Sequence, residues 1–281
     1  MRKVSFINMK GGVGKTTLST NVAHCLATRE NCKVLVVDID PQFNATQCFF
    51  SGDKYIEYLK KKGRTILDLF QENVANISTV DGVTGIESFN YSDIKPIQIL
   101  ENLFMLPGNL NLYQIEISAG SGKENRLKKY LDEINKIYHF DYVIIDTPPT
   151  PSIWMISALL ASDYYIIPVK PDPLSYTGIE LLQNIIYQKK RDLDLNIKCM
   201  GIVLTIVEEG TIVFNKCMET IGKKKQLKDL LYKKYLKKRT DIAKFQLNQQ
   251  FILDQSKDDI KLCLTGIVQE MIKRINDDET K

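Results

Sequence analysis

The sequence predicts an α/β fold, a doubly wound and mostly parallel sheet with helices on both faces. Short apolar runs alternate with helical patterns along the 281 residues, and this alternation is typical of such sheets. Two of these runs end in aspartate, at the strand ends where ligands bind in such folds. With 44% hydrophobic residues, the chain suits one domain spanning 1–281.

Six runs rich in Val, Ile and Leu are predicted to be strands. They are almost continuously apolar, as expected for strands that are covered on both faces. The predicted strands are 4–7, 33–37, 103–106, 142–145, 164–169 and 200–205.

Helical patterns fill most of the intervals between these strands. The predicted helices are 15–28, 65–71, 124–138, 153–160, 174–190, 212–235 and 258–275. The stretch from about 49 to 98 is polar and irregular, and we interpret it as a possible insertion that packs over the functional site.

Residues 10–17 read K-G-G-V-G-K-T-T and form the most informative motif of the chain. The motif follows a predicted strand and opens a predicted helix, which is the context that a phosphate-binding loop requires. Its glycines let backbone N–H groups point inward, and the helix N-terminus adds positive potential. The residues predicted to bind a nucleoside triphosphate are Lys10, Gly11, Gly12, Val13, Gly14, Lys15, Thr16 and Thr17.

Carboxylates at two later strand ends are predicted to complete this site. Within the loop, Lys15 is expected to reach the outer phosphates and the Thr16 hydroxyl to bind Mg²⁺. Asp38 and Asp40 follow a predicted strand and project to the same side, and Asp146 ends another apolar run. An aspartate after such a run is typical of carboxylates that support the magnesium shell. We therefore predict a metal site at Thr16, Asp40 and Asp146.

The motifs resemble those of one ATPase superfamily. K-G-G-V-G-K-T-T resembles the deviant Walker A loop of the ParA and MinD superfamily, a group of P-loop NTPases. V-D-I-D-P-Q-x-N-A-T and I-I-D-T-P-P are similar to the switch region and second carboxylate motif of ParA proteins. The resemblance covers roughly residues 1–205. One departure is Phe43, at a position where the family usually has glycine.

The resemblance implies slow, magnesium-dependent hydrolysis of ATP to ADP and phosphate. It assigns catalytic roles to Lys10, Lys15 and Asp40, with Asp40 orienting the attacking water. In the family, the first lysine of the loop reaches across a dimer interface to the partner's nucleotide. This role is carried over to Lys10, which implies an ATP-dependent homodimer.

A strongly basic stretch near the C-terminus is a candidate DNA-binding element. Residues 223–239 contain nine basic residues and one acidic residue, a net charge of +8 in a chain whose total is +4. A solvated helix face is the ordinary explanation for such a run, but nonspecific, salt-sensitive DNA binding is also typical of it. We place it in a basic helical segment at about 212–239. The candidate DNA contacts are Lys223, Lys224, Lys225, Lys233, Lys234, Lys237, Lys238 and Arg239.

Three functions are compatible with these motifs. The leading hypothesis is a ParA-type partition ATPase of plasmid or chromosome, which is cytoplasmic, associates with the nucleoid and is released by a ParB-like adaptor. A MinD-like membrane ATPase would need an amphipathic C-terminal helix. The tail is amphipathic but ends in acidic residues, so no stable membrane association is expected. A small-molecule P-loop enzyme is the third alternative.

Overall fold

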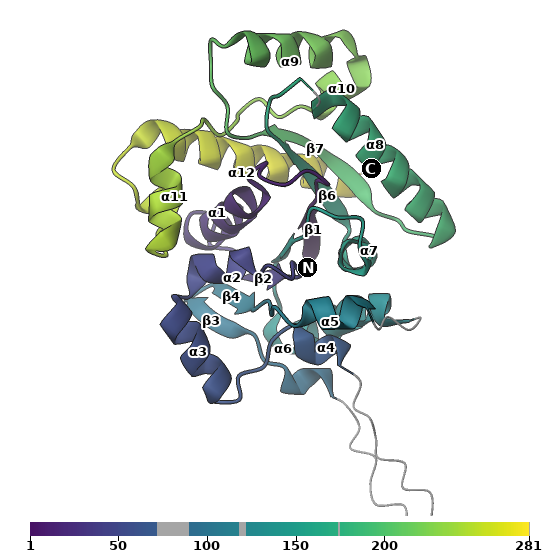
Figure 1. Ribbon diagram of the computed structural model, residues 1–281, viewed down its shortest axis with the longest axis vertical. Coiled ribbons are helices and arrows are strands. Elements are labelled where there is room, and N and C mark those ends of the chain that lie inside the picture. Colours follow the sequence, from purple (N-terminus) through teal and green to yellow (C-terminus); the bar gives the residue numbers. More distant parts are fainter. Residues whose placement is uncertain (72–89, 118–121, 174, 281) are drawn as a thin grey trace, which may run out of the picture.

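The computed structural model describes residues 1–71, 90–117, 122–173 and 175–280. Its centre is a seven-stranded sheet of order β3-β4-β2-β5-β1-β6-β7 (Figure 1). The strands are β1 (Arg2–Phe6), β2 (Val34–Asp38), β3 (Ile97–Leu100), β4 (Leu103–Leu106), β5 (Tyr142–Asp146), β6 (Tyr164–Val169) and β7 (Lys198–Leu204). All neighbours are parallel except β3, which is antiparallel to β4. The doubly wound fold is thus confirmed.

Helices cover both faces of the sheet (Figure 1). One face packs against α1 (Lys15–Thr28), α2 (Asn44–Phe49), α11 (Thr240–Leu247) and α12 (Asp258–Glu279). The other packs against α4 (Leu67–Phe70), α5 (Leu112–Ile117), α6 (Arg126–Tyr138), α7 (Ile153–Ala161), α8 (Ser175–Asp192), α9 (Ile212–Lys223) and α10 (Lys225–Leu230). Helix α3 (Gly52–Lys60) has no buried residue.

Strand β2 shows how the sequence builds two apolar layers. Val34 and Val36 belong to the core that includes α1 and α12, whereas Leu35 and Val37 belong to the core that includes α6 and α7. Successive side chains of a strand point to opposite faces. A continuously apolar strand is therefore what a doubly covered sheet needs, and the carboxyl ends of β1, β2 and β5 are left to carry polar groups.

The predicted elements correspond closely to the observed ones, with two kinds of difference. All six predicted strands are present, and the helix predicted at 15–28 is α1. Strand β3 and helices α2, α3, α5 and α11 had not been predicted. Within the polar stretch 49–98, residues 72–89 lie outside the described part of the chain, as does residue 174 of the predicted helix 174–190.

The prediction of a single helix at 212–235 is wrong. The chain instead forms two helices, α9 and α10, which are separated at Lys224. Residues 231–238 then run along the edge of the sheet beside β7. Tyr232 N donates to Ile202 O at 2.9 Å, and Leu236 N donates to Leu204 O at 3.0 Å. Gly201, with φ of +132°, permits this approach, because a Cβ there would lie 2.4 Å from a backbone oxygen of residue 230. Sheet-edge bonding therefore replaces the helix.

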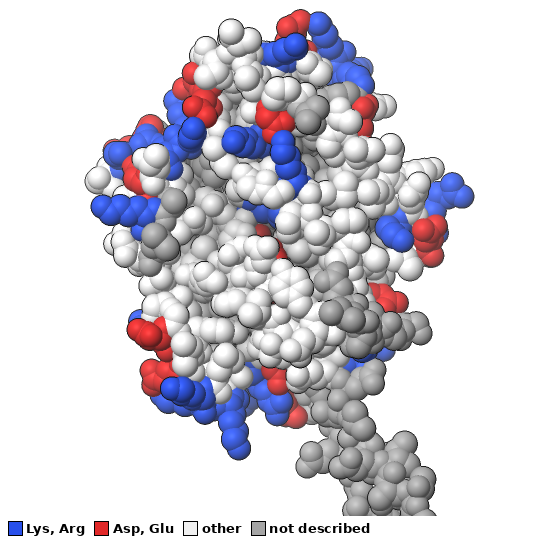
Figure 2. Space-filling model, in the orientation of Figure 1, with Lys and Arg blue, Asp and Glu red and all other residues white. Residues whose placement is uncertain are grey.

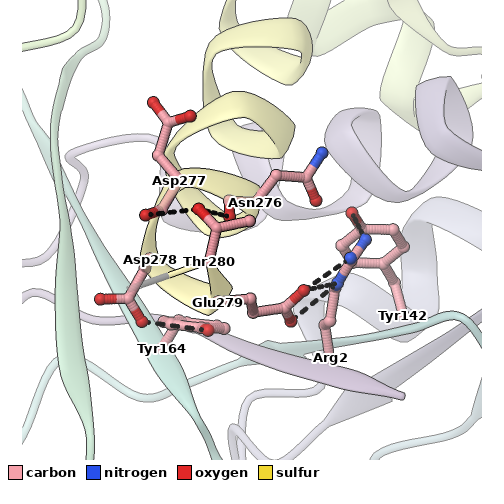
Figure 3. A network of polar contacts seen from close by, with 8 residues as sticks. All are labelled: Arg2, Tyr142, Tyr164, Asn276, Asp277, Asp278, Glu279 and Thr280. Carbon is pink, nitrogen blue, oxygen red and sulfur yellow. Dashed lines mark hydrogen bonds and ion pairs between the residues drawn. The ribbon is translucent and has the colours of Figure 1, made fainter.

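Both chain ends are fixed at the amino edge of the sheet (Figure 3). Arg2 binds Glu279 of the last turn of α12 at 2.7 Å and donates to the Tyr142 hydroxyl at 2.9 Å. Asp278 pairs with Lys198 at 2.8 Å. The apolar face of α12 is buried in the core, so this helix packs within the domain. Among the described residues, no helix has the length and apolar character that a membrane crossing requires.

Candidate functional site

The loop between β1 and α1 lies at the carboxyl edge of the sheet. Gly12 and Gly14 have φ angles of +70° and +76°, which glycine adopts at little cost. The Thr205 hydroxyl donates to Val13 O at 2.5 Å, so the end of β7 also holds the loop. The predicted phosphate loop thus has a fixed, curled backbone at the start of a 14-residue helix.

Lys15, Thr16 and Asp146 form one connected cluster at the base of this loop. The Thr16 hydroxyl donates to Asp146 Oδ2 at 2.7 Å, and the Ser19 hydroxyl donates to Asp146 Oδ1 at 2.9 Å. Burial raises the pKa of Asp146 to about 6, although Lys15 opposes this shift. Burial lowers the pKa of Lys15, against the attraction of Asp146 and Asp40. Ser19 was not identified from the sequence.

The two aspartates after β2 occupy different environments. Asp38 is completely buried and accepts 2.7 Å bonds from both the backbone N–H and the hydroxyl of Thr46. The Thr46 hydroxyl in turn accepts from Gly108 N at 2.7 Å, so Asp38 ties α2 to the loop after β4. Asp40 instead lines the pocket, and its Oδ1 accepts from Gln42 N at 2.9 Å. Only Asp40 of this pair faces the candidate site.

A pocket of about 880 Å³ lies over the loop. Its floor is formed by Gly11–Thr17, and Asp40 faces it from the end of β2. Its other walls come from the start of α2, from α3 through Tyr55 and Ile56, and from α11 and its following turn through Gln246 and Gln249. A volume of this size suits a nucleotide-sized ligand. The hydroxyl and carboxylate oxygens of Thr16, Asp40 and Asp146 are the donor types that Mg²⁺ prefers.

Comparison with known proteins identifies the family. A family model described as an AAA domain matches residues 1–199. The sporulation initiation inhibitor protein Soj of Bacillus subtilis is 31% identical over 232 residues, which covers 82% of this chain and 81% of Soj. The chromosome partitioning protein ParA of Myxococcus xanthus is 29% identical over 220 residues, which covers 78% of this chain and 70% of that protein. The chain belongs to the ParA/Soj family of ATPases.

Solved structures agree with this ParA-family assignment. A plasmid partition protein from Borrelia burgdorferi bound to AMPPNP is 26% identical and superposes with a TM-score of 0.72. The superposition covers 97% of this chain and 98% of that protein. A cobyrinic acid a,c-diamide synthase from Mycobacterium smegmatis with bound ADP and magnesium is 22% identical, with a TM-score of 0.62, and shares the fold alone. The resemblance seen in the motifs is therefore confirmed, and the more similar relatives are partition proteins.

Lys10, the first lysine of the loop, is paired within its own subunit. Lys10 forms an ion pair with Asp172 of its own subunit, and half of its side chain remains exposed. It is absent from the described residues that line the pocket, whereas Lys15 is among them. The two lysines of the loop therefore lie in different surroundings.

The Phe43 position, where the ParA family usually has glycine, is held by α3. Phe43 has a left-handed φ of +42°, which is unfavourable for a side chain of its size. Its ring stacks on Tyr55 with centroids 5.5 Å apart, and the Tyr55 hydroxyl donates to Gly108 O at 2.7 Å. Helix α3 therefore braces the switch loop where a glycine would leave it free.

The residues predicted to contact DNA fall into two electrostatic groups. Five of them form ion pairs within the chain: Lys223 with Glu219, Lys224 with Glu180, Lys237 with Glu209, Lys238 with Glu208, and Arg239 with Asp259. Within the described part of the chain, Lys225, Lys233 and Lys234 have no such acidic partner, and neither does Lys228 of the same stretch. Figure 2 shows positive charge near α9 and α10, at the margin of a face whose middle is mostly uncharged.

Two glutamines of the pocket were missed by sequence reasoning. Gln246 and Gln249 belong to α11 and its following turn, beyond residues 1–199 that match the family model. The Gln246 amide nitrogen donates to the Thr17 hydroxyl at 3.1 Å, a contact between residues 229 positions apart. No motif marks these glutamines, and only the three-dimensional packing of α11 against α1 reveals them.

Proposed function

We propose that this ParA-family chain is a magnesium-dependent ATPase that slowly hydrolyses ATP to ADP and phosphate, and that it acts in the partition of a plasmid or chromosome. The observation that carries the proposal is the cluster at the curled loop, in which the Thr16 hydroxyl donates to Asp146 and the Lys15 charge opposes the raised pKa of that carboxyl, because it combines a phosphate-binding cation with oxygen donors for Mg²⁺. When bound, the magnesium ion would neutralise phosphate charge.

The polar groups around the loop have distinct roles in this proposal. The backbone N–H groups of 11–15 bind the phosphates, and Lys15 neutralises their outer oxygens. Thr16 contributes its hydroxyl to the metal, while Asp146 orients that hydroxyl and supports the metal shell. Asp40 orients the attacking water. Phosphoryl transfer depends mainly on positioning and charge neutralisation, so this set of groups is sufficient for slow hydrolysis.

ATP would join two copies of the chain through Lys10. This lysine is half exposed beside the loop, outside the pocket of its own subunit, so a partner's nucleotide is its available target. The ion pair with Asp172 would open when the partner approaches. Two subunits joined in this way present two basic surfaces at once, which strengthens binding to an extended anion.

The proposed ligand of the assembled dimer is nonspecific DNA, bound through the lysines of α10 and the segment 231–239. A ParB-like adaptor on the cargo would stimulate hydrolysis and release the protein from the nucleoid. Two relatives support the role in partition: a chromosome partitioning protein and a virulence plasmid ParA family protein of Chlamydia psittaci.

DNA binding measured with ATP, with ADP and without nucleotide tests the proposal. Wild-type protein should bind a random duplex tightly only with ATP and Mg²⁺. Lys10→Ala should still bind ATP but lose both dimerisation and tight DNA binding. Lys136→Ala is the matched control, because Lys136 is an exposed lysine of α6.

Two results would contradict the proposal. DNA binding that ignores the nucleotide would reduce the basic segment to an ordinary charged surface. A Lys10→Ala protein that dimerises with ATP as well as Lys136→Ala does would remove the role of Lys10.

A further inference from the structure

A smaller hollow adjoins the nucleotide pocket on the side of α11. Its volume is about 170 Å³, and it shares Gly14, Thr17 and Gln246 with the larger pocket. Apolar side chains that include Ile206 and Ile242 form part of its wall. A hollow this small holds only part of a drug-sized ligand. If the loop binds the phosphates, as proposed above, the smaller hollow lies next to the phosphate site, and its size suits one flat ring system.

Gln246 stands at the junction of the two spaces, and its amide group is hydrogen-bonded to residues of α1 and α2. The amide nitrogen donates to the Thr17 hydroxyl at 3.1 Å and approaches Cys48 Sγ at 3.7 Å. The Thr17 hydroxyl can in turn donate to the amide oxygen, at 3.4 Å. A side-chain amide has two donors on nitrogen and two acceptor sites on oxygen. Both donors of the nitrogen are engaged, whereas the oxygen keeps a second acceptor site that a ligand can use.

The surroundings of α11 keep this amide in place. Asn21 of α1 donates to Thr17 O at 2.8 Å and accepts from Ile252 N at 2.7 Å, so it joins the loop to the chain that follows α11. At the other end of α11, Arg239 forms an ion pair with Asp259 at the start of α12. Helix α11 is thereby fixed on both sides, and Gln246 is a pre-positioned group.

We propose that Gln246 determines base specificity by accepting a hydrogen bond from the 6-amino group of adenine. Guanine and hypoxanthine carry a carbonyl oxygen at this position, which would face the amide oxygen and set two acceptors against each other without a donor between them. A protein site that hydrogen-bonds a substrate group rejects analogues that lack it. This inference rests on the proposed nucleotide-binding function, and it assigns the selection of ATP to a residue outside the family-matched segment.

Competition binding with ATP and ITP tests this inference, because the two nucleotides differ at the position that Gln246 contacts. Each unlabelled nucleotide, with Mg²⁺, would displace a fluorescent ATP analogue. Wild-type protein should prefer ATP over ITP by about tenfold. Gln246→Leu and Gln246→Met should bring the ratio to within about threefold, whereas Gln246→Glu should keep the preference because its carboxylate also accepts. Gln250→Leu is the matched control, since Gln250 is exposed and lines neither space.

The outcomes separate this inference from the function on which it rests. Equal affinity of wild-type protein for ATP and ITP, or an unchanged ratio in a folded Gln246→Leu or Gln246→Met protein, would overturn the role of Gln246 and leave the ATPase proposal intact. Failure of wild-type protein to bind any nucleoside triphosphate would overturn the ATPase proposal itself.

Discussion

Asp146 is the residue at which the needs of stability and of function oppose each other. It is completely buried, and its register partner on the neighbouring strand is a second buried carboxyl, Asp38. Burial and Asp146 raise the pKa of Asp38, and burial raises that of Asp146 to about 6. Hydrogen bonds from Thr16 and Ser19 compensate only in part. A carboxylate that has to be charged to support a cation is therefore costly when no cation is bound.

This opposition predicts that Asp146→Asn stabilises the nucleotide-free protein. The pKa of Asp146 is higher in the folded chain than the ordinary value of 3.8, so the folded state binds the proton more tightly. Folding stability therefore falls as the pH rises from about 4 to about 6, and the full cost remains above pH 6. At pH 7, Asp146→Asn should raise the free energy of unfolding by roughly 1–3 kcal/mol, measured by urea denaturation.

The same comparison at pH 4.5 is the internal control for Asp146→Asn. There the stabilisation should be smaller, because part of the wild-type population already carries the proton. A variant that is equally or less stable than wild type at both pH values would contradict the prediction. Binding of ATP with Mg²⁺ should meanwhile weaken, since the carboxylate is lost from the metal shell.

At this scale, the sequence predicted which residues gather and not always what each one does. The loop and Asp146 could be recognised because short motifs carry their chemistry. Asp38 and Asp40 looked alike, since both follow the same strand. Their difference depends on Gly108, whose backbone binds the Thr46 hydroxyl from a distant part of the chain. Contacts of this kind leave no local pattern in the sequence.

At the scale of elements, the stretch 212–239 shows where periodicity misleads. Leu227, Leu230 and Leu231 have helical spacing, and the charges between them suggested a continuous amphipathic helix. The observed structure after Leu230 is instead an extended segment joined to the sheet edge by isolated bridges, and it depends on the close approach that Gly201 allows. Helical periodicity predicted α1 and α12 well, because no sheet edge competes for those segments.

The division of this stretch predicts unequal contributions to DNA binding. Lys225 and Lys228 are exposed on α10, whereas Lys237 and Lys238 pair with Glu209 and Glu208. Replacing Lys225 and Lys228 by glutamine should reduce the log–log salt slope by about 1.8 if each lysine contacts one phosphate. The matched pair Lys237→Gln and Lys238→Gln should reduce it less, because their glutamates already neutralise part of that charge. Affinity titrations at four or more salt concentrations would measure both slopes. Equal changes in the two slopes would show that the ion pairs open on DNA.

At the scale of the whole molecule, the candidate site collects residues from across the chain. The phosphate loop and its carboxylates come from residues 1–199, which match the family model, while α11 comes from beyond them. The first part could be predicted because function restricts its local sequence. The α11 wall could not, since a helix that supplies one pocket side chain needs no motif. The two parts meet where α11 packs against α2 and where Gln246 bonds to Thr17 of α1.

The proposed dimer predicts a concentration-dependent thermal stability. A ligand that binds only the folded state stabilises it by about 2.7 kcal/mol at 100 times its dissociation constant, and association adds a further term that grows with protein concentration. With ATP and Mg²⁺, the Tm of wild-type protein should therefore rise as the protein is concentrated, and with ADP it should not.

Lys10→Ala should keep the increase in Tm that ATP binding alone causes, because Lys10 is not among the residues that line its own pocket. Its Tm should then be independent of protein concentration, as measured by differential scanning calorimetry. Complete loss of the ATP effect in Lys10→Ala would mean that this lysine binds the nucleotide of its own subunit, and a concentration-independent wild type would exclude the dimer as the ATP-bound state.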